Sequence, residues 1–166
     1  MVWKPRCGIP LLLDGAWRWV ALTTSLHLVW EIAQLPLYTI VRTESVGRVV
    51  FAVFHCTAGD AFISGGAYLL AAWCLGAPYW PTTRAAAGST IALSFGLLTT
   101  ARSEWVNVYG KESWAYTNDM PLVFGIGVTP VLQWIVVPLI TLLWIRSCSR
   151  HIAVSNDRGS SCGGRS

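Results

Sequence analysis

The sequence predicts an all-α integral membrane protein, a bundle of four transmembrane helices joined by short loops. Of its 166 residues, 54% are hydrophobic and only 12% are charged, whereas a soluble domain has about 25% charged residues. The chain also contains ten Trp, a residue that is enriched at membrane–water interfaces. Its apolar residues form four stretches, and each is long enough to cross a bilayer, for which about 20 residues suffice.

The four expected spans are residues 16–41, 49–76, 85–108 and 121–145. Residues 1–15 are expected to form a cytoplasmic N-terminal segment, and residues 146–166 a basic, Ser/Gly-rich and disordered tail. Pro36 predicts a kink in the last turn of the first span. Gly125, Gly127 and Pro130 predict that the fourth span begins irregularly.

A row of small residues marks one face of the third span. Gly88, Ala92, Gly96 and Thr100 follow at four-residue intervals and lead to Glu104. Residues four apart lie on one helix face. Small residues in such a row allow two helices to approach closely within a membrane.

The distribution of Lys and Arg predicts the orientation. With four spans, both termini share a side with the turn at residues 78–84, and that side carries most of the basic residues. These are Lys4, Arg6, Arg18, Arg84, Arg146, Arg150, Arg158 and Arg165. Basic residues favour the cytoplasmic side, so both termini are expected in the cytoplasm. The short loops suit a bacterial inner membrane. The net charge of +4 is therefore a topology signal, and we expect no nucleic-acid partner.

Five ionisable residues lie within the expected spans at similar depth. Ionisable groups at membrane depth are costly and usually functional. His27 and Glu31 share a face of the first span, together with Gln34. The others lie in the outer halves of the second and third spans, and the predicted catalytic set is His27, Glu31, His55, Asp60 and Glu104. His55 and Asp60 are five residues apart, which places them on different faces of a regular helix.

Two kinds of chemistry fit this set, and a purely structural role is the alternative to both. His27, Glu31, His55 and Glu104 are candidate ligands for a divalent metal such as Zn, Mn or Fe. Without a metal, the same groups are candidates for acid/base catalysis or proton relay. In the structural alternative, His27 bonds a neighbouring carboxylate and locks the bundle.

Aromatic and polar residues near the outer side predict a pocket for a lipid or isoprenoid. Its candidate residues are Trp30, Arg102, Trp114, Tyr116, Gln133 and Trp134. Trp30 and Trp134 lie too deep to belong to an interfacial belt.

The segment from Glu104 through Trp114-Ala115-Tyr116 to Gln133 loosely resembles the small membrane-embedded carotenoid (lycopene) cyclases. Those proteins combine an aromatic loop with a later Pro, here Pro130, and an acidic pair. The likeness covers about a fifth of the chain. Leu132 and Gln133 stand where the acidic pair is expected, so the chain is not assigned to that family.

The sequence therefore leaves three functions open. The first is a membrane-embedded enzyme that acts on a lipid or isoprenoid by metal-dependent or acid/base chemistry. The second is an ion- or proton-coupled carrier, for which a chain of 166 residues suggests a homodimer. The third is a structural or assembly subunit of a larger membrane complex. In each case membrane lipid is an expected partner.

Overall fold

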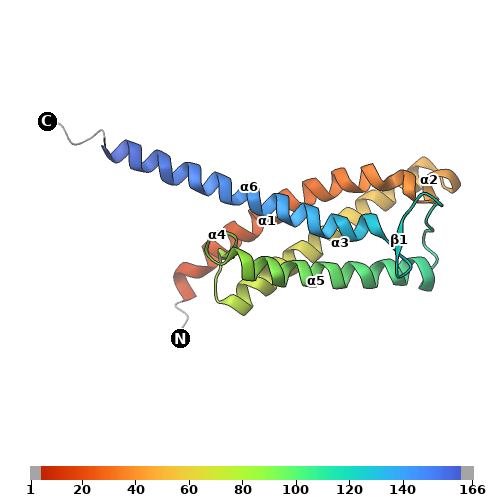
Figure 1. The fold of residues 1–166 in the computed structure, drawn as a ribbon, viewed down its shortest axis with the longest axis horizontal. Helices are drawn as coiled ribbons and strands as arrows, with labels where there is room; N and C mark the ends of the chain where they lie inside the picture. Colours follow the sequence, from red (N-terminus) through yellow and green to blue (C-terminus); the bar gives the residue numbers. More distant parts are fainter. Residues whose placement is uncertain (1–4, 162–166) are drawn as a thin grey trace.

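The computed structural model describes the backbone of residues 5–161 and the side chains of residues 12–149. Within this range four long helices pack together into one bundle (Figure 1): α1 (Pro5–Gln34), α3 (Val46–Leu75), α5 (Ala85–Trp105) and α6 (Val128–Ser161). The shorter elements are η1 (Leu35–Leu37), α2 (Ile40–Thr43), α4 (Trp80–Thr83), the π-helix η2 (Val106–Gly110), β1 (Leu122–Val123) and β2 (Ile126–Gly127). The all-α prediction of four main helices is confirmed.

The four long helices form a closed ring of neighbours. α1 packs against α3, α3 against α5, α5 against α6, and α6 back against α1. The second half of α6 projects beyond the other helices (Figure 1). Side chains on the inner faces of all four helices can therefore meet near the bundle axis.

The ends of α1 and α3 follow local sequence rules. Pro36 ends α1 at Gln34 and continues the chain as a 3-10 turn, where the sequence had predicted only a kink. A proline cannot donate the backbone hydrogen bond that would extend an α-helix. Ser45 caps the start of α3, where its side chain accepts from the Arg48 amide at 3.4 Å, and Gly76 caps the end of the helix with φ 58°. Both caps are typical of helix termini.

The small-residue face of α5 is confirmed as its buried face. The buried residues of this helix are Ala85, Gly88, Ala92, Gly96, Thr100 and Glu104. A Cβ atom on Gly88 would overlap the ring of Trp80, and one on Gly96 would overlap the ring of Trp134. The absence of side chains at these two positions lets large indole rings pack directly against the α5 backbone.

Trp19, Tyr68 and Trp80 form an aromatic cluster at the α4 end of the bundle. Ring centroids lie 5.1 Å apart for Trp19 and Trp80, 6.0 Å for Trp19 and Tyr68, and 5.7 Å for Tyr68 and Trp80. All three side chains are buried, and alanines and Leu142 pack around them. This cluster is the hydrophobic core.

The opposite end of the bundle is closed by the 111–120 segment and a small hairpin. Thr39 N donates to Ala115 O and Thr117 N to Leu37 O, both at 2.9 Å, so this segment crosses the end of α1. Residues 121–127, expected as the irregular start of the fourth span, instead form the β1–β2 hairpin. Its tip has positive φ at Phe124 (51°) and Gly125 (79°).

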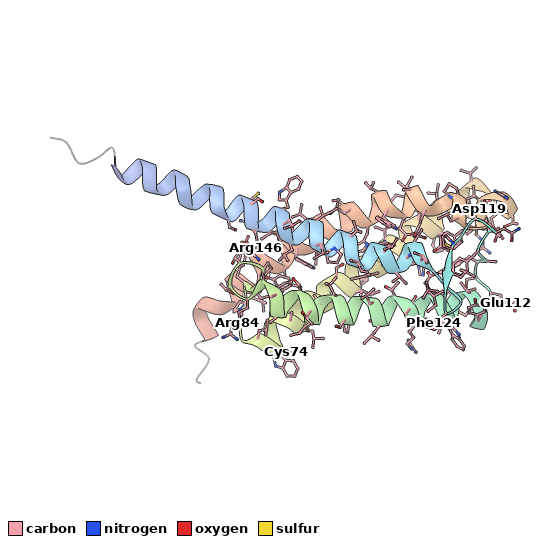
Figure 2. The ribbon with its side chains drawn as sticks, viewed as in Figure 1. Cys74, Arg84, Glu112, Asp119, Phe124 and Arg146 are labelled. Carbon is pink, nitrogen blue, oxygen red and sulfur yellow. The ribbon has the colours of Figure 1, made fainter. Side chains whose placement is uncertain are left out.

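Two of the helices, α3 and the Val128–Ser149 part of α6, are long and apolar enough to cross a membrane. Charges differ between the bundle ends (Figure 2): Arg84 and Arg146 lie toward the α4 end, whereas Glu112 and Asp119 lie at the hairpin end. The backbone of α6 continues as a helix to Ser161. Residues 162–166 and the side chains beyond residue 149 lie outside the described part, so the disordered tail stays a prediction.

Candidate functional site

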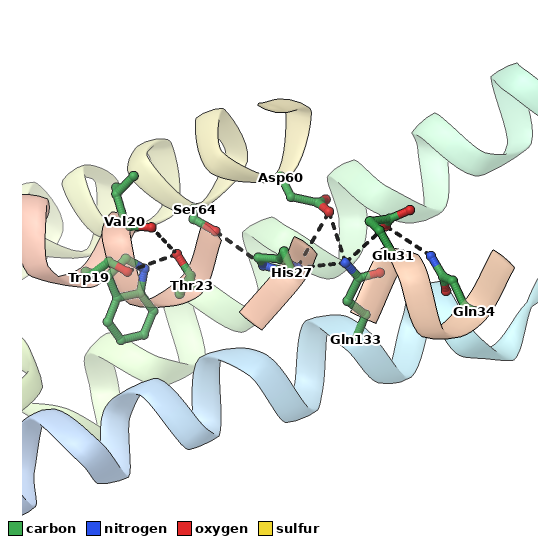
Figure 3. Close-up of polar contacts among 9 residues, drawn as sticks. All are labelled: Trp19, Val20, Thr23, His27, Glu31, Gln34, Asp60, Ser64 and Gln133. Carbon is green, nitrogen blue, oxygen red and sulfur yellow. Dashed lines mark hydrogen bonds and ion pairs between the residues drawn. The ribbon is translucent and has the colours of Figure 1, made fainter. Parts of the chain in front are cut away.

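A buried hydrogen-bond network joins α1, α3 and α6 at the middle of the bundle (Figure 3). His27 is fully buried, and the Gln133 amide donates to its Nδ1 at 2.7 Å. The same amide nitrogen lies 3.0 Å from Asp60 Oδ2 and 3.2 Å from Glu31 Oε1. Gln133 is thus the centre of the network, because it contacts the other three side chains.

The hydrogen-bond partners of His27 indicate which of its ring nitrogens carries the hydrogen. Since Nδ1 accepts from Gln133, the hydrogen of a neutral ring is on Nε2, which faces Ser64 Oγ at 3.5 Å. Asp60 Oδ2 also lies 3.5 Å from Nδ1. The indole ring of Trp134 packs against the imidazole with ring centroids 4.9 Å apart. The imidazole therefore has a polar neighbour at each ring nitrogen and an indole ring packed against it. The carboxyl group of Asp60 lies beside Nδ1, which is the nitrogen that can accept a proton.

The network has fewer hydrogens than acceptors. The amide nitrogen of Gln133 carries two hydrogens, yet three acceptor atoms on His27, Glu31 and Asp60 surround it. Glu31 also accepts from Gln34 Nε2 at 3.0 Å. One further proton, on either carboxyl group or on the imidazole, would give every close contact a hydrogen.

Glu104 lies across from this network and has its own donor. Tyr116 Oη donates to Glu104 Oε2 at 2.6 Å, and the side chains of Tyr38 and Trp114 lie beside the same carboxyl group. Burial, and then the bond to Glu104, raise the pKa of Tyr116 well above its usual value. Tyr116 therefore keeps its proton and stays a hydrogen-bond donor to Glu104.

A cavity of about 140 Å³ connects the two groups of polar side chains. Its lining includes three carboxyl groups, from Glu31, Asp60 and Glu104, on three different helices. Aliphatic side chains such as Leu35, Ile40, Val53 and Ile63 complete much of the wall. Among the described residues that line it there is no Lys or Arg.

The cavity opens at the side of the bundle. Its solvent-exposed lining residues are His55 and Gly59 on α3 and Ser103 on α5, whereas its lining residues on α1 and α6 are buried or half-buried. A Cβ atom on Gly59 would meet nothing within 4 Å. The mouth therefore lies between α3 and α5, beside Gly59.

The predicted catalytic residues take three different positions. His27, Glu31 and Asp60 meet in the network, and Glu104 lines the same cavity. His55 lies at the mouth, with its ring stacked on Phe51 at a centroid distance of 5.7 Å. His55 and Asp60 nevertheless line the same cavity, with His55 at its exposed mouth and Asp60 in the network.

The predicted pocket residues also lie in different places, and only some of them line the cavity. Trp114 and Gln133 line the cavity, Tyr116 holds Glu104, and Trp134 supports His27. Trp30 and Arg102 are not among the lining residues, and Arg102 is exposed.

The predicted metal ligands are not gathered around one point. Within the described residues, no group of three or more His, Cys, Asp or Glu side chains is placed to hold a metal ion. The Nδ1 atom of His27 accepts from an amide, and His55 lies at the mouth. The metal site stays a prediction that no contact in the structure supports.

The cavity lining also contains residues that were not predicted as site residues, among them Gln34, Tyr38 and Thr100. The sequence places Gln34 only on the face of Glu31, and Thr100 only in the row of small residues. Gln34 and Thr100 could have been found as polar residues on faces that also carry a carboxylate within one helical turn.

The comparisons with known proteins give no relative. No family model matches the chain, and no curated protein and no solved structure is significantly similar to it. The geometry of the site is therefore the basis for inferring a function.

Proposed function

We propose that the protein is a membrane-embedded enzyme that performs acid/base chemistry on a lipid-like substrate, such as an isoprenoid. The observation that carries this proposal is the proton-deficient network of His27, Glu31, Asp60 and Gln133, which opens directly onto a largely apolar cavity. A network that has a place for one more proton, and that touches a substrate-sized space, can give and take that proton during a reaction.

The outer surface of the bundle supports a membrane location for all four long helices. Large apolar side chains point outward from each of them, including Val29 on α1, Phe62 on α3, Leu98 on α5 and Leu143 on α6. α1 and α5 are less apolar than α3 and the Val128–Ser149 part of α6. α1 carries His27 and Glu31, and α5 carries Arg102, Glu104 and several Ser, Thr and Gly residues. A soluble protein rarely exposes such an apolar surface to water, whereas the hydrocarbon core of a bilayer is a favourable environment for it.

The charges at the two ends support the predicted orientation. Arg84 and Arg146 belong to the α4 end, and Glu112 and Asp119 to the hairpin end (Figure 2). Basic residues favour the cytoplasm. The protein then lies in a bacterial inner membrane with the α4 end and both termini in the cytoplasm, and the cavity lies in the outer half.

The charge of the cavity suits a substrate that becomes positive during reaction. Three carboxyl groups line it, with no basic residue among its described lining residues. Preorganised groups of this kind stabilise charge that develops in the transition state. Addition of a proton to a carbon–carbon double bond creates such a positive charge, and loss of a proton from a neighbouring carbon removes it. The reaction class is isomerisation or cyclisation, with no net gain of protons.

The residues divide this work by their contacts. Asp60 and Glu31 share the Gln133 amide and exchange the proton, with His27 beside Asp60 as its partner. Glu104 is held by Tyr116 at 2.6 Å, so it acts as a fixed negative group on the opposite wall.

The aromatic cluster favours an enzyme over a proton-conducting carrier. Toward the α4 end, the polar contacts of His27 among the described residues extend only to Ser64, and Thr23 donates to the carbonyl of Trp19 on its own helix. Next come the packed rings of Trp19, Tyr68 and Trp80. These rings separate the network from the α4 end of the bundle, whereas a carrier needs access from both sides.

Deuterium exchange tests the proposal without knowledge of the natural substrate. The purified protein in proteoliposomes is incubated in heavy water with an apolar lipid extract from the source membranes, and carbon-bound deuterium is measured by mass spectrometry. We expect incorporation with the wild-type protein. For Asp60→Asn and Glu31→Gln we expect a loss of about 10²–10⁴-fold, the usual contribution of an acid/base group.

Glu44→Gln is the matched control, because Glu44 is exposed in the loop before α3 and its one ion pair within the described residues is with Arg48. This variant should retain wild-type incorporation. Absence of incorporation with the wild-type protein, or full incorporation with both site variants, would contradict the proposal.

A further inference from the structure

Three residues that line the cavity carry a buried polar atom with no partner among the described residues: Oε1 of Gln34, Oγ1 of Thr100 and Nε1 of Trp114. The Trp114 nitrogen lies beside the carboxyl group of Glu104, so Gln34 Oε1 and Thr100 Oγ1 are the two that no neighbouring polar group accounts for. Gln34 is 6% exposed and Thr100 is 8% exposed. An unpaired polar atom that is buried costs free energy, and most such atoms in folded proteins are hydrogen-bonded. Their occurrence together on one cavity therefore indicates a ligand group that pairs with them.

Thr100 differs from the other threonines of its helix. Thr90 and Thr99 donate to the carbonyl groups of Ala86 and Phe95, at 3.1 and 2.7 Å, which is the usual arrangement for Thr within a helix. Thr100 makes no such bond among the described residues. Its hydroxyl group is thus free to bond a molecule in the cavity.

The orientation of the Gln34 amide is fixed by its neighbour. Its Nε2 donates to the carboxyl group of Glu31 at 3.0 Å. The oxygen of the amide is then the atom left without a partner, on a residue that lines the cavity. An amide oxygen only accepts hydrogen bonds, so the ligand must supply a donor there.

We propose that the cavity binds an apolar alcohol, whose hydroxyl group donates to Gln34 Oε1 and accepts from Thr100 Oγ1. A hydroxyl group can donate and accept at once, whereas an ether or ketone only accepts. A carboxylate or phosphate is disfavoured, because Glu31, Asp60 and Glu104 line the same cavity. The inference rests on the proposed function and narrows its substrate class to a lipid-like molecule with one hydroxyl group.

Protection of Cys56 from alkylation tests this without any turnover. Cys56 lines the cavity and is a free thiol. In a full-length variant with Cys7, Cys74, Cys148 and Cys162 replaced by Ser, the rate of labelling by N-ethylmaleimide is measured in nanodiscs. Three probes are added in turn: dodecanol, dodecyl methyl ether and dodecane. We expect dodecanol to protect Cys56 at about fivefold lower concentration than the ether, the effect of one hydrogen bond.

Thr100→Val should reduce this preference for the alcohol, and Thr100→Ser should restore it. Thr99→Val is the matched control, because the hydroxyl group of Thr99 donates to the carbonyl of Phe95 within the helix. This variant should keep the preference for the alcohol. Equal protection by the three probes, no protection by any of them, or an equal loss in Thr99→Val and Thr100→Val would overturn the inference. Deuterium exchange that depends on Asp60 alongside any of these results would leave the acid/base proposal standing.

Discussion

The two halves of the bundle use the same four helices for different purposes. In the α4 half, Trp19, Tyr68 and Trp80 pack against one another between the helices and form the hydrophobic core. In the hairpin half, the space holds a cavity of about 140 Å³ with three carboxyl groups on its wall. Close packing maximises stability, whereas a cavity and clustered acidic groups reduce it. One half of the bundle therefore holds the fold together, while the other half contains the cavity and the polar groups of the proposed site.

The largest expected effect is the loss of stability on emptying the packed half. Trp80→Ala removes a fully buried ring that contacts Trp19, Tyr68 and the backbone at Gly88. We expect unfolding in detergent to become easier by about 3–5 kcal/mol. The measurement is an unfolding titration in mixed micelles. Trp73→Ala is the control, because Trp73 is 81% exposed on the outside of the bundle; an equal loss in both variants would contradict the assignment of the core.

A smaller effect is expected in the polar half. Gln133→Leu removes the donor shared by His27, Glu31 and Asp60, and acceptors left unpaired should destabilise the protein by about 1–3 kcal/mol. The same titration measures this change. Adding Asp60→Leu should recover part of the lost stability, since it removes one unpaired carboxyl group. Strictly additive losses in the double variant would mean that the two residues do not interact.

The smallest effect on stability is expected at the mouth of the cavity. Gly59→Phe adds a ring where a Cβ atom meets nothing within 4 Å, so stability should be unchanged. Labelling of Cys56 by N-ethylmaleimide should nevertheless slow by roughly tenfold, which corresponds to about 1.4 kcal/mol of extra barrier. Gly47→Phe is the control, because Gly47 also has free space around it, on the same helix but away from the cavity. Unchanged labelling in Gly59→Phe would place the mouth elsewhere.

The features that the sequence could predict depend on periodicity within one helix. The four-residue row from Gly88 to Glu104 identified the buried face of α5 correctly. The shared face of His27 and Glu31 likewise pointed to a polar centre within the bundle. Regular helix geometry is sufficient for both conclusions, because each compares residues a few positions apart.

The features that could not be predicted depend on contacts between distant segments. Gln133 was expected as a pocket residue, but its place between three acceptors follows from how α6 packs against α1 and α3. The bond from Tyr116 to Glu104 requires the 111–120 segment to fold back over the bundle. No local pattern contains this information, since the partner residues are set by the path of the chain.

The pairing of residues 37–39 with residues 115–117 has a consequence for how the protein can change over evolution. These contacts join main-chain atoms, so they persist when side chains are exchanged. Trp114 and Tyr116, which stand on this backbone, face the acidic wall. New side chains there would reshape the site for another molecule while the helices stay in place. The helical frame can therefore be inherited unchanged as the loop adapts.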